Sequence, residues 1–93
     1  MPESSSITIT PYKLWVWMLC SLRYAMGRRS SVVSDIAEDL IQYFHVFDTH
    51  QRKQFIREIR EELERAENMG RTLGDPMDHK LWEETANKLE SRL

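Results

Sequence analysis

Residues 14–31 read LWVWMLCSLRYAMGRRSS, and this stretch decides the fold. Its first part, residues 14–22, is the most apolar run of the chain, and its end contains one glycine, two arginines and two serines in succession. We expect residues 14–22 to form the buried centre of the fold. Residues 23–31 combine clustered positive charge with the predicted start of a helix, so this is where we expect a functional site.

A first helix is predicted over residues 11 to about 26, because Thr10 is a favourable N-cap and proline is favoured at the first helical position. Gly27 suits the position just after the helix. Apolar residues cover nearly the whole circumference, which is typical of a helix buried on all sides. We therefore place this helix at the centre of the fold, with Cys20 buried as a small hydrophobic residue.

Three more helices are predicted from capping residues and apolar spacing. The second begins at Ser30-Ser31 and ends near residues 45–47, the third runs from Asp48 to about residue 69, and the fourth begins at Asp75-Pro76. Residues spaced three and four apart define their buried sides. These residues are Val33, Ile36, Ala37, Leu40, Ile41 and Phe44; Phe55, Ile56, Ile59, Leu63 and Ala66; and Leu81, Trp82, Thr85, Ala86, Leu89 and Leu93.

The composition supports an all-α domain. The chain has 93 residues, 41% hydrophobic and 30% charged, with only three glycines and three prolines to build turns. We predict a compact bundle of about four helices over residues 11–93, preceded by a short extended arm over residues 1–10. Ile7 and Ile9 of the arm would point the same way and pack on a neighbour, or the arm would fray.

Charge, cysteine content and apolar run length exclude several classes of protein. The net charge of −2 argues against a nucleic-acid binder that relies on overall charge. A single cysteine excludes an internal disulfide and fits a reducing compartment. The apolar run is far shorter than the roughly 20 residues of a membrane span, and the acidic start does not resemble a signal peptide. We therefore predict a cytoplasmic protein that does not bind membranes.

Opposite charges four residues apart occur repeatedly along residues 51–67. Arg57 and Glu61, Arg60 and Glu64, and Glu61 and Arg65 have the spacing at which side chains meet on one side of a helix. We expect these three pairs to form along a helix with one side facing inward. The apolar repeat is too short for a coiled-coil seam.

The GRRSS segment predicts an anion or partner site at the end of the first helix. A glycine turn followed by a helix N-terminus exposes N–H groups that attract anions, and arginines can form two hydrogen bonds with one phosphate or carboxylate. The alternative is a simple helix–helix turn with solvated arginines, some of them paired with Asp35 or Asp39. The residues of the predicted site are Arg23, Tyr24, Gly27, Arg28, Arg29, Ser30 and Ser31.

Two nucleic-acid or nucleotide motifs are disfavoured at this segment. The second glycine and the lysine of a P-loop are absent. A helix-turn-helix would present Asp35, Glu38 and Asp39 to the DNA phosphates, which repel them.

No catalytic or metal constellation stands out. No two of His45, His50 and His79 are four residues apart, and a zinc site needs a denser cluster. We therefore predict a non-enzyme with no catalytic residue, no metal and no cofactor.

Nine aromatic residues exceed what a four-helix core of this size requires. Tryptophan, tyrosine and arginine dominate the energetics of protein–protein interfaces. We expect part of the first helix, including Trp15 or Trp17, to remain uncovered and to contact a partner.

Residues 22–36, LRYAMGRRSSVVSDI, resemble a segment found in small uncharacterised phage and prophage proteins, RYALGR-(S/T)-x-VV. The resemblance covers about half of the chain, and only RYAMGRRS is distinctive. The acidic turn of those proteins differs here, because Pro76-Met77 separates Asp75 from Asp78, so nothing is carried over for that region. The family has no known activity. It implies an accessory phage gene, many of which encode small proteins that block host machinery, including anti-CRISPR inhibitors.

We therefore predict a small, non-enzymatic phage-type protein that binds and blocks a host protein or defence complex. We also expect self-association, as a dimer, through the first helix or the arm. The alternatives are a module that binds phosphate, nucleotides or nucleic acid at the Arg28-Arg29 turn, and a structural phage oligomer.

Overall fold

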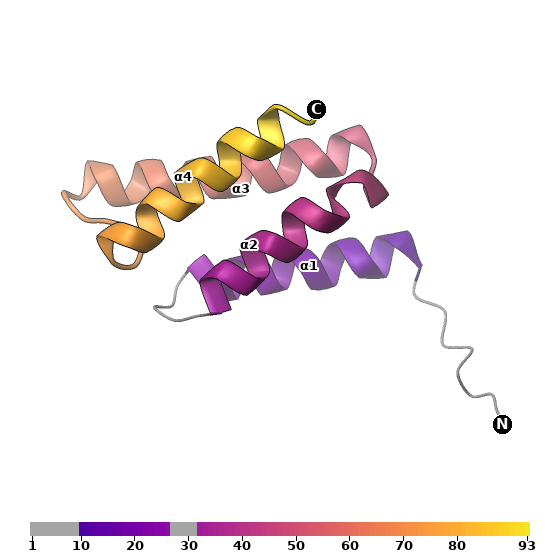
Figure 1. Ribbon diagram of the computed structural model, residues 1–93, viewed down its shortest axis with the longest axis horizontal. Helices are drawn as coiled ribbons and strands as arrows, with labels where there is room; N and C mark the ends of the chain where they lie inside the picture. The colour runs from indigo at the N-terminus through magenta and orange to yellow at the C-terminus, as the bar shows by residue number, and fades with distance from the viewer. Residues whose placement is uncertain (1–9, 27–31) are drawn as a thin grey trace, which may run out of the picture.

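The computed structural model of the chain describes residues 10–26 and 32–93, and this part is all-α. It contains α1 (Pro11–Met26), α2 (Val32–Tyr43), the short 3-10 helix η2 (Phe44–Val46), α3 (Thr49–Asn68) and α4 (Pro76–Glu90) (Figure 1). The prediction of four helices is confirmed, and the predicted boundaries of α2 and α3 differ from the observed ones by only a few residues.

The four helices pack so that each has two principal neighbours. α3 lies beside α4, α4 beside α2, α2 beside α1, and α1 beside α3 (Figure 1). The connector between α3 and α4 lies at the same end of the bundle as the C-terminus of α1. α1 is therefore one of four corners, and the prediction that it would be the central helix is wrong.

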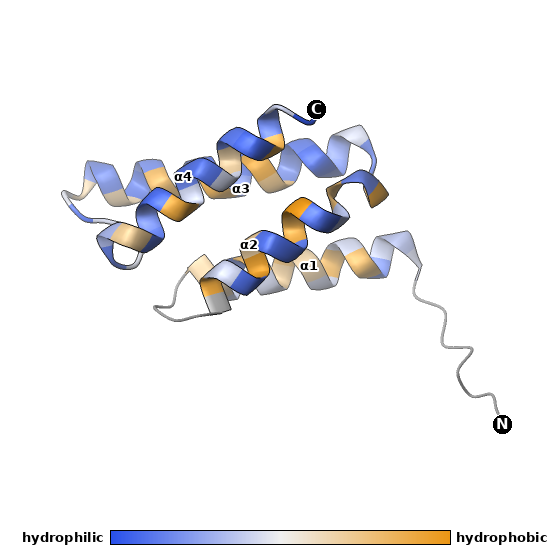
Figure 2. Cartoon of the chain, viewed as in Figure 1, coloured by the Kyte–Doolittle hydropathy of each residue, from blue (hydrophilic) through white to orange (hydrophobic). Residues whose placement is uncertain are grey.

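All four helices and η2 contribute buried side chains to the core. The largest fully buried side chains include Trp82, Phe44, Phe47 and Phe55. Phe47 and Phe55 pack edge to face, with ring centroids 5.0 Å apart. In Figure 2 the orange, hydrophobic positions of these helices face the interior and the blue positions face outward.

The predicted buried side of α3 is confirmed at every position, because all five of its apolar residues are buried. The predictions for α2 and α4 hold less completely. Ile36, Ile41 and Leu81 are only partly buried at the edge of the core. Leu93 is 55% exposed because α4 ends at Glu90, so its predicted place in the core is wrong.

The predicted N-caps are confirmed where the structure describes them. Thr10 Oγ1 accepts the Lys13 N–H at the start of α1. Asp48 accepts the Gln51 N–H at 2.8 Å, and the Gln51 side chain accepts the Asp48 N–H in return. Such reciprocal capping satisfies N–H groups that the helix itself leaves unpaired.

The connector from α3 to α4 is fixed by backbone hydrogen bonds and by a second capping box. Gly70 has a φ of +69°, and the N–H groups of Gly70 and Arg71 donate to the carbonyls of Glu67 and Ala66, which is a Schellman ending. Asp75 then caps α4 by accepting the Asp78 N–H at 2.9 Å. This arrangement holds the first turn of α4 against the last turn of α3.

The three predicted charge pairs along α3 are wrong, because their arginines have other partners. Arg57 donates to Gln54 and Arg65 pairs with Glu62, three residues away rather than four. Arg60 reaches across to Asn87 and Glu90 of α4. Only Arg60 therefore exchanges a partner along α3 for one on α4, while Arg57 and Arg65 pair with residues three positions away on α3 itself.

No helix in the described ranges is long and apolar enough to cross a membrane. The predicted arm, apart from Thr10, and the predicted turn at Gly27, Arg28, Arg29, Ser30 and Ser31 lie outside the described residues.

Candidate functional site

The outer side of α1 carries four exposed residues, three of them aromatic, together with the partly buried Val16. A spacing of four residues places Tyr12, Val16, Cys20 and Tyr24 along one side of the helix. Trp17 lies beside this row. Tyr12 is 65% exposed, and Trp17 and Tyr24 are each 56% exposed. We call these five residues the aromatic face of α1.

Two predictions about the burial of residues 14–22 are wrong. Only Leu19 and Leu22 of this run are buried, so it does not form the centre of the core. Cys20 is exposed, not buried as predicted. The physical reason is that α1 packs mainly on α2 and α3, and these two helices cover only one side of a helix that is apolar all round.

Trp15 and Trp17, which the sequence grouped together, lie on different sides of α1. Trp15 is half-buried against the core, with its ring centroid 5.9 Å from that of Tyr12. Its indole Nε1 is enclosed and has no hydrogen-bond acceptor within the described part of the chain. Trp17 faces outward and therefore belongs to the surface that a partner can reach.

Arg23 binds a carboxylate of its own chain. Its Nε and Nη2 donate to the two oxygens of Glu58 at 2.8 and 3.0 Å, which joins the last turn of α1 to the middle of α3. The hydrogen bonds from Arg23 hold the pKa of Glu58 below its usual value, and the same pair raises the pKa of Arg23. Arg23 thus has a structural contact that its position about one turn before the GRRSS segment did not suggest.

Tyr24 and Trp17 are the residues of the predicted site that the structure places on the aromatic face, and both are exposed. Gly27, Arg28, Arg29, Ser30 and Ser31 follow α1 directly in the sequence but lie outside the described ranges, so their role remains a sequence prediction. Tyr12 and Cys20 were missed. Their spacing of four from Val16 and Tyr24 was visible, but the opposite side of α1 is equally apolar.

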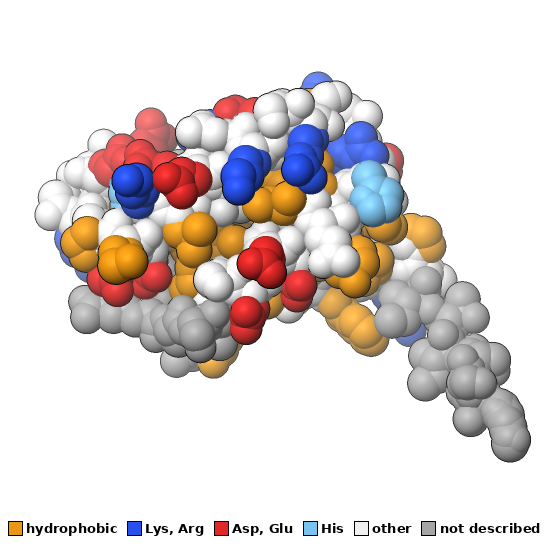
Figure 3. Space-filling model, in the orientation of Figure 1, with side chains coloured by type: hydrophobic (Ala, Val, Ile, Leu, Met, Phe, Trp, Pro, Cys, Tyr) orange, Lys and Arg blue, Asp and Glu red, His pale blue; other side chains and the backbone are white. Residues whose placement is uncertain are grey.

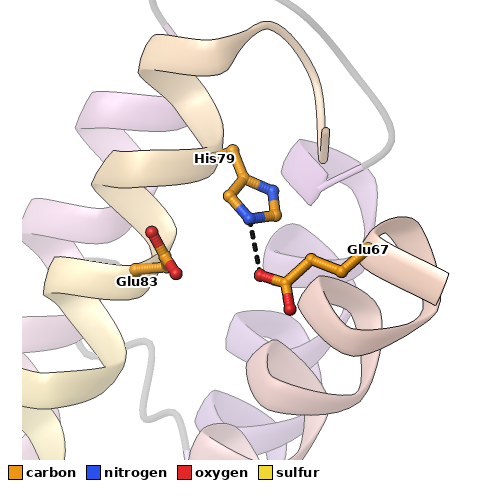
Figure 4. A group of neighbouring side chains, drawn as sticks. All are labelled: Glu67, His79 and Glu83. Carbon is orange, nitrogen blue, oxygen red and sulfur yellow. Dashed lines mark hydrogen bonds and ion pairs between the residues drawn. The ribbon is translucent and has the colours of Figure 1, made fainter. Parts of the chain in front are cut away.

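A second group of polar side chains lies between α3 and α4. Glu67 of α3 and His79 and Glu83 of α4 bring one possible ligand atom each to within 4.8 Å of one another (Figure 4). His79 Nε2 lies 2.9 Å from Glu67 Oε2, and His79 Nδ1 accepts the Leu73 N–H at 2.9 Å. The sequence contained part of this signal, since His79 and Glu83 are four residues apart on one helix.

The hydrogen bonds of His79 oppose metal binding at this group. A neutral imidazole that accepts the Leu73 N–H at Nδ1 carries its proton on Nε2, the nitrogen that faces Glu67. A metal bound at Nε2 would displace that proton to Nδ1. The Nδ1–H would then face the Leu73 N–H, which is a donor, whereas metal-bound histidines normally donate this hydrogen to an acceptor. The group therefore fits a structural link between α3, α4 and their connector better than a metal site.

Comparisons with protein-family models, with curated proteins and with solved structures yield no match for this chain.

Proposed function

We propose that this chain is a non-enzymatic binding protein that covers the surface of another protein with the aromatic face of α1. The observation that carries the proposal is the exposure of Tyr12, Trp17 and Tyr24, each by more than half, on one side of one helix. Exposed aromatic side chains that form one patch are typical of protein-interaction sites.

Charge indicates what kind of surface the partner offers. Residues 10–31 contain Lys13, Arg23, Arg28 and Arg29 and no acidic residue, whereas the whole chain has 15 acidic residues against 13 basic ones. The α1 segment is thus the basic part of an acidic chain. A partner surface with an apolar centre and acidic edges would complement it.

The same charges favour a different protein over a second copy of this chain. Arg23 is already paired with Glu58, but the other charges of the segment, Lys13, Arg28 and Arg29, are all basic, so placing two such segments face to face costs binding energy. This charge argument, together with the resemblance to phage accessory proteins, supports a host protein, such as a defence complex, as the proposed partner. Self-association through α1 remains the alternative that the experiment must separate.

The test uses the full chain immobilised as bait, with lysates of bacterial hosts and purified defence complexes as the sources of partners. Trp17→Ala should weaken capture of the partner by about 2 kcal/mol or more if Trp17 is a hot spot, which is roughly 30-fold. Tyr43→Ala is the matched control, because Tyr43 is an aromatic residue of α2 that is 43% exposed and lies outside the aromatic face.

A double variant, Arg28→Ala with Arg29→Ala, tests the predicted basic extension of the site. Loss of the same partner would support that extension, and unchanged capture would limit the site to α1. Unchanged capture by Trp17→Ala would contradict the proposal itself. Sedimentation of the isolated protein would reveal a dimer, and its loss in Trp17→Ala would favour the second-copy alternative.

A further inference from the structure

A small basic pocket lies where α2 and η2 end, away from the aromatic face of α1. Its volume is about 90 Å³. Figure 3 shows Lys and Arg side chains and a histidine gathered at the end of the visible face where α2 meets α3. The residues that line the pocket are Ile41, Phe44, His45, Arg52 and Arg92.

This lining contains no carboxylate. The larger hollows along α3 differ in this respect. The hollow between α1 and α3 contains Glu58 and Glu62, and the one between α3 and α4 contains several glutamates. Arginines in those hollows have anionic neighbours, whereas the pocket at the end of α2 presents only basic and apolar side chains.

Arg52 is held rigidly in this pocket. Its Nε donates to the Phe44 carbonyl at 3.1 Å and its Nη2 to the His45 carbonyl at 2.9 Å. Its guanidinium carbon also lies 5.8 Å from the centre of the Phe44 ring. A guanidinium has five N–H donors, so the Nη1 group and one N–H of Nη2 are left for another acceptor.

Arg92 approaches the same helix end from the C-terminus of the chain. Its Nη1 donates to the Ile41 carbonyl over a long 3.4 Å, and neither Arg52 nor Arg92 forms an ion pair with a described carboxylate. The carbonyls at a helix C-terminus carry about half a negative charge in total. That partial charge does not balance two guanidinium groups.

We propose that this pocket binds a phosphate group, held between Arg52 and Arg92 with His45 at its edge. A phosphate dianion supplies the charge that the two arginines lack, and its oxygens match the paired N–H donors of guanidinium groups. The Arg52 guanidinium needs no further ordering to bind it. The small pocket holds the phosphate group alone, so any organic part attached to it lies outside.

The test is a titration of the full chain with inorganic phosphate at constant ionic strength, followed by NMR of the arginine Nε–H signals. Saturable binding in the millimolar range is expected, with the signals of Arg52 and Arg92 shifting together. Arg92→Gln should weaken binding about tenfold, the value of one lost charge-assisted hydrogen bond. Arg92 is exposed and follows the last helix, so this variant should keep the fold.

Lys88→Gln is the matched control, because it removes the same charge from an exposed position of α4 that does not line the pocket. Its affinity should equal that of the wild type. Shifts that do not saturate, or equal affinities for Arg92→Gln and the wild type, would show a general salt effect only and would overturn the proposal.

Two further ligands identify the source of the phosphate group. Glycerol phosphate and AMP would bind as inorganic phosphate does if the pocket recognises the phosphate group alone. Tighter binding of AMP would assign the pocket to nucleotides. Arg52→Lys keeps the charge but removes the paired donors. It should weaken the binding of all three ligands.

Discussion

α1 and α3 are the two longest helices of the bundle, and they use apolar residues in opposite ways. α3 has a single narrow row of them, and the whole row is buried. α1 is apolar nearly all round, yet only Leu19, Leu22, Ala25 and Met26 are buried. A narrow apolar row dictates which side of a helix faces the core. In a helix that is apolar on every side, the packing of the neighbouring helices determines which side is buried. The side that they do not cover is available to a partner.

The largest effect on stability is expected from truncating the buried row of α3. Phe55 is fully buried and packs edge to face on Phe47, so Phe55→Ala should lower the free energy of unfolding by about 3–5 kcal/mol. Urea denaturation measures this loss. A loss below about 1 kcal/mol would contradict the place assigned to α3 in the core.

The next largest loss of stability is expected from a substitution in the connector between α3 and α4. Gly74 has a φ of +80°, and a Cβ there would lie 2.7 Å from Oδ2 of Asp78, the oxygen that faces the Asp75 N–H. Gly74→Ala should therefore lower stability by about 2–3 kcal/mol, the sum of backbone strain and the loss of this cap.

Gly70→Ala is the control for that prediction. Gly70 has a similar φ of +69°, but a Cβ there meets nothing within 4 Å. Only the strain of about 1–2 kcal/mol should appear. Equal losses for the two variants in thermal denaturation would show that the contact with Asp78 contributes nothing.

A smaller effect is expected from the one ion pair that joins the two compared helices. Glu58→Gln should lower stability at neutral pH by less than about 1 kcal/mol, because Arg23 is largely exposed to solvent. Since Arg23 lowers the pKa of Glu58, the pair stabilises the fold at any pH above the ordinary carboxyl value of about 4.3.

This contribution is lost as the pH falls through the lowered pKa of Glu58. The stabilities of wild type and Glu58→Gln should therefore converge at the acid end of a series of urea denaturations. Glu61→Gln, which removes a carboxylate from an exposed position of α3, is the control variant measured beside it. A constant gap between wild type and Glu58→Gln would show that the difference comes from packing instead of charge.

The contrast between α1 and α3 also explains which features could be predicted from the sequence. Caps such as Asp48 and Asp75, and the buried side of α3, are local patterns, and they were predicted correctly. The pairing of Arg23 with Glu58 spans 35 residues, and the link from Glu67 to His79 spans 12. Such contacts depend on how helices are placed in space. The exposed side of α1 depended on this too, so the sequence could not separate Trp15 from Trp17.

The smallest effect on stability is expected on the aromatic face. Trp17 is more than half exposed, so Trp17→Ala should change the free energy of unfolding by less than about 1 kcal/mol. A loss near that of Phe55→Ala would contradict the exposed position. If the loss grew with protein concentration, a second copy of the chain would be covering α1, because association stabilises a fold more as the concentration of free partner rises. A small loss at every concentration would leave this face open for a different protein, while α3 would remain the helix on which the fold depends.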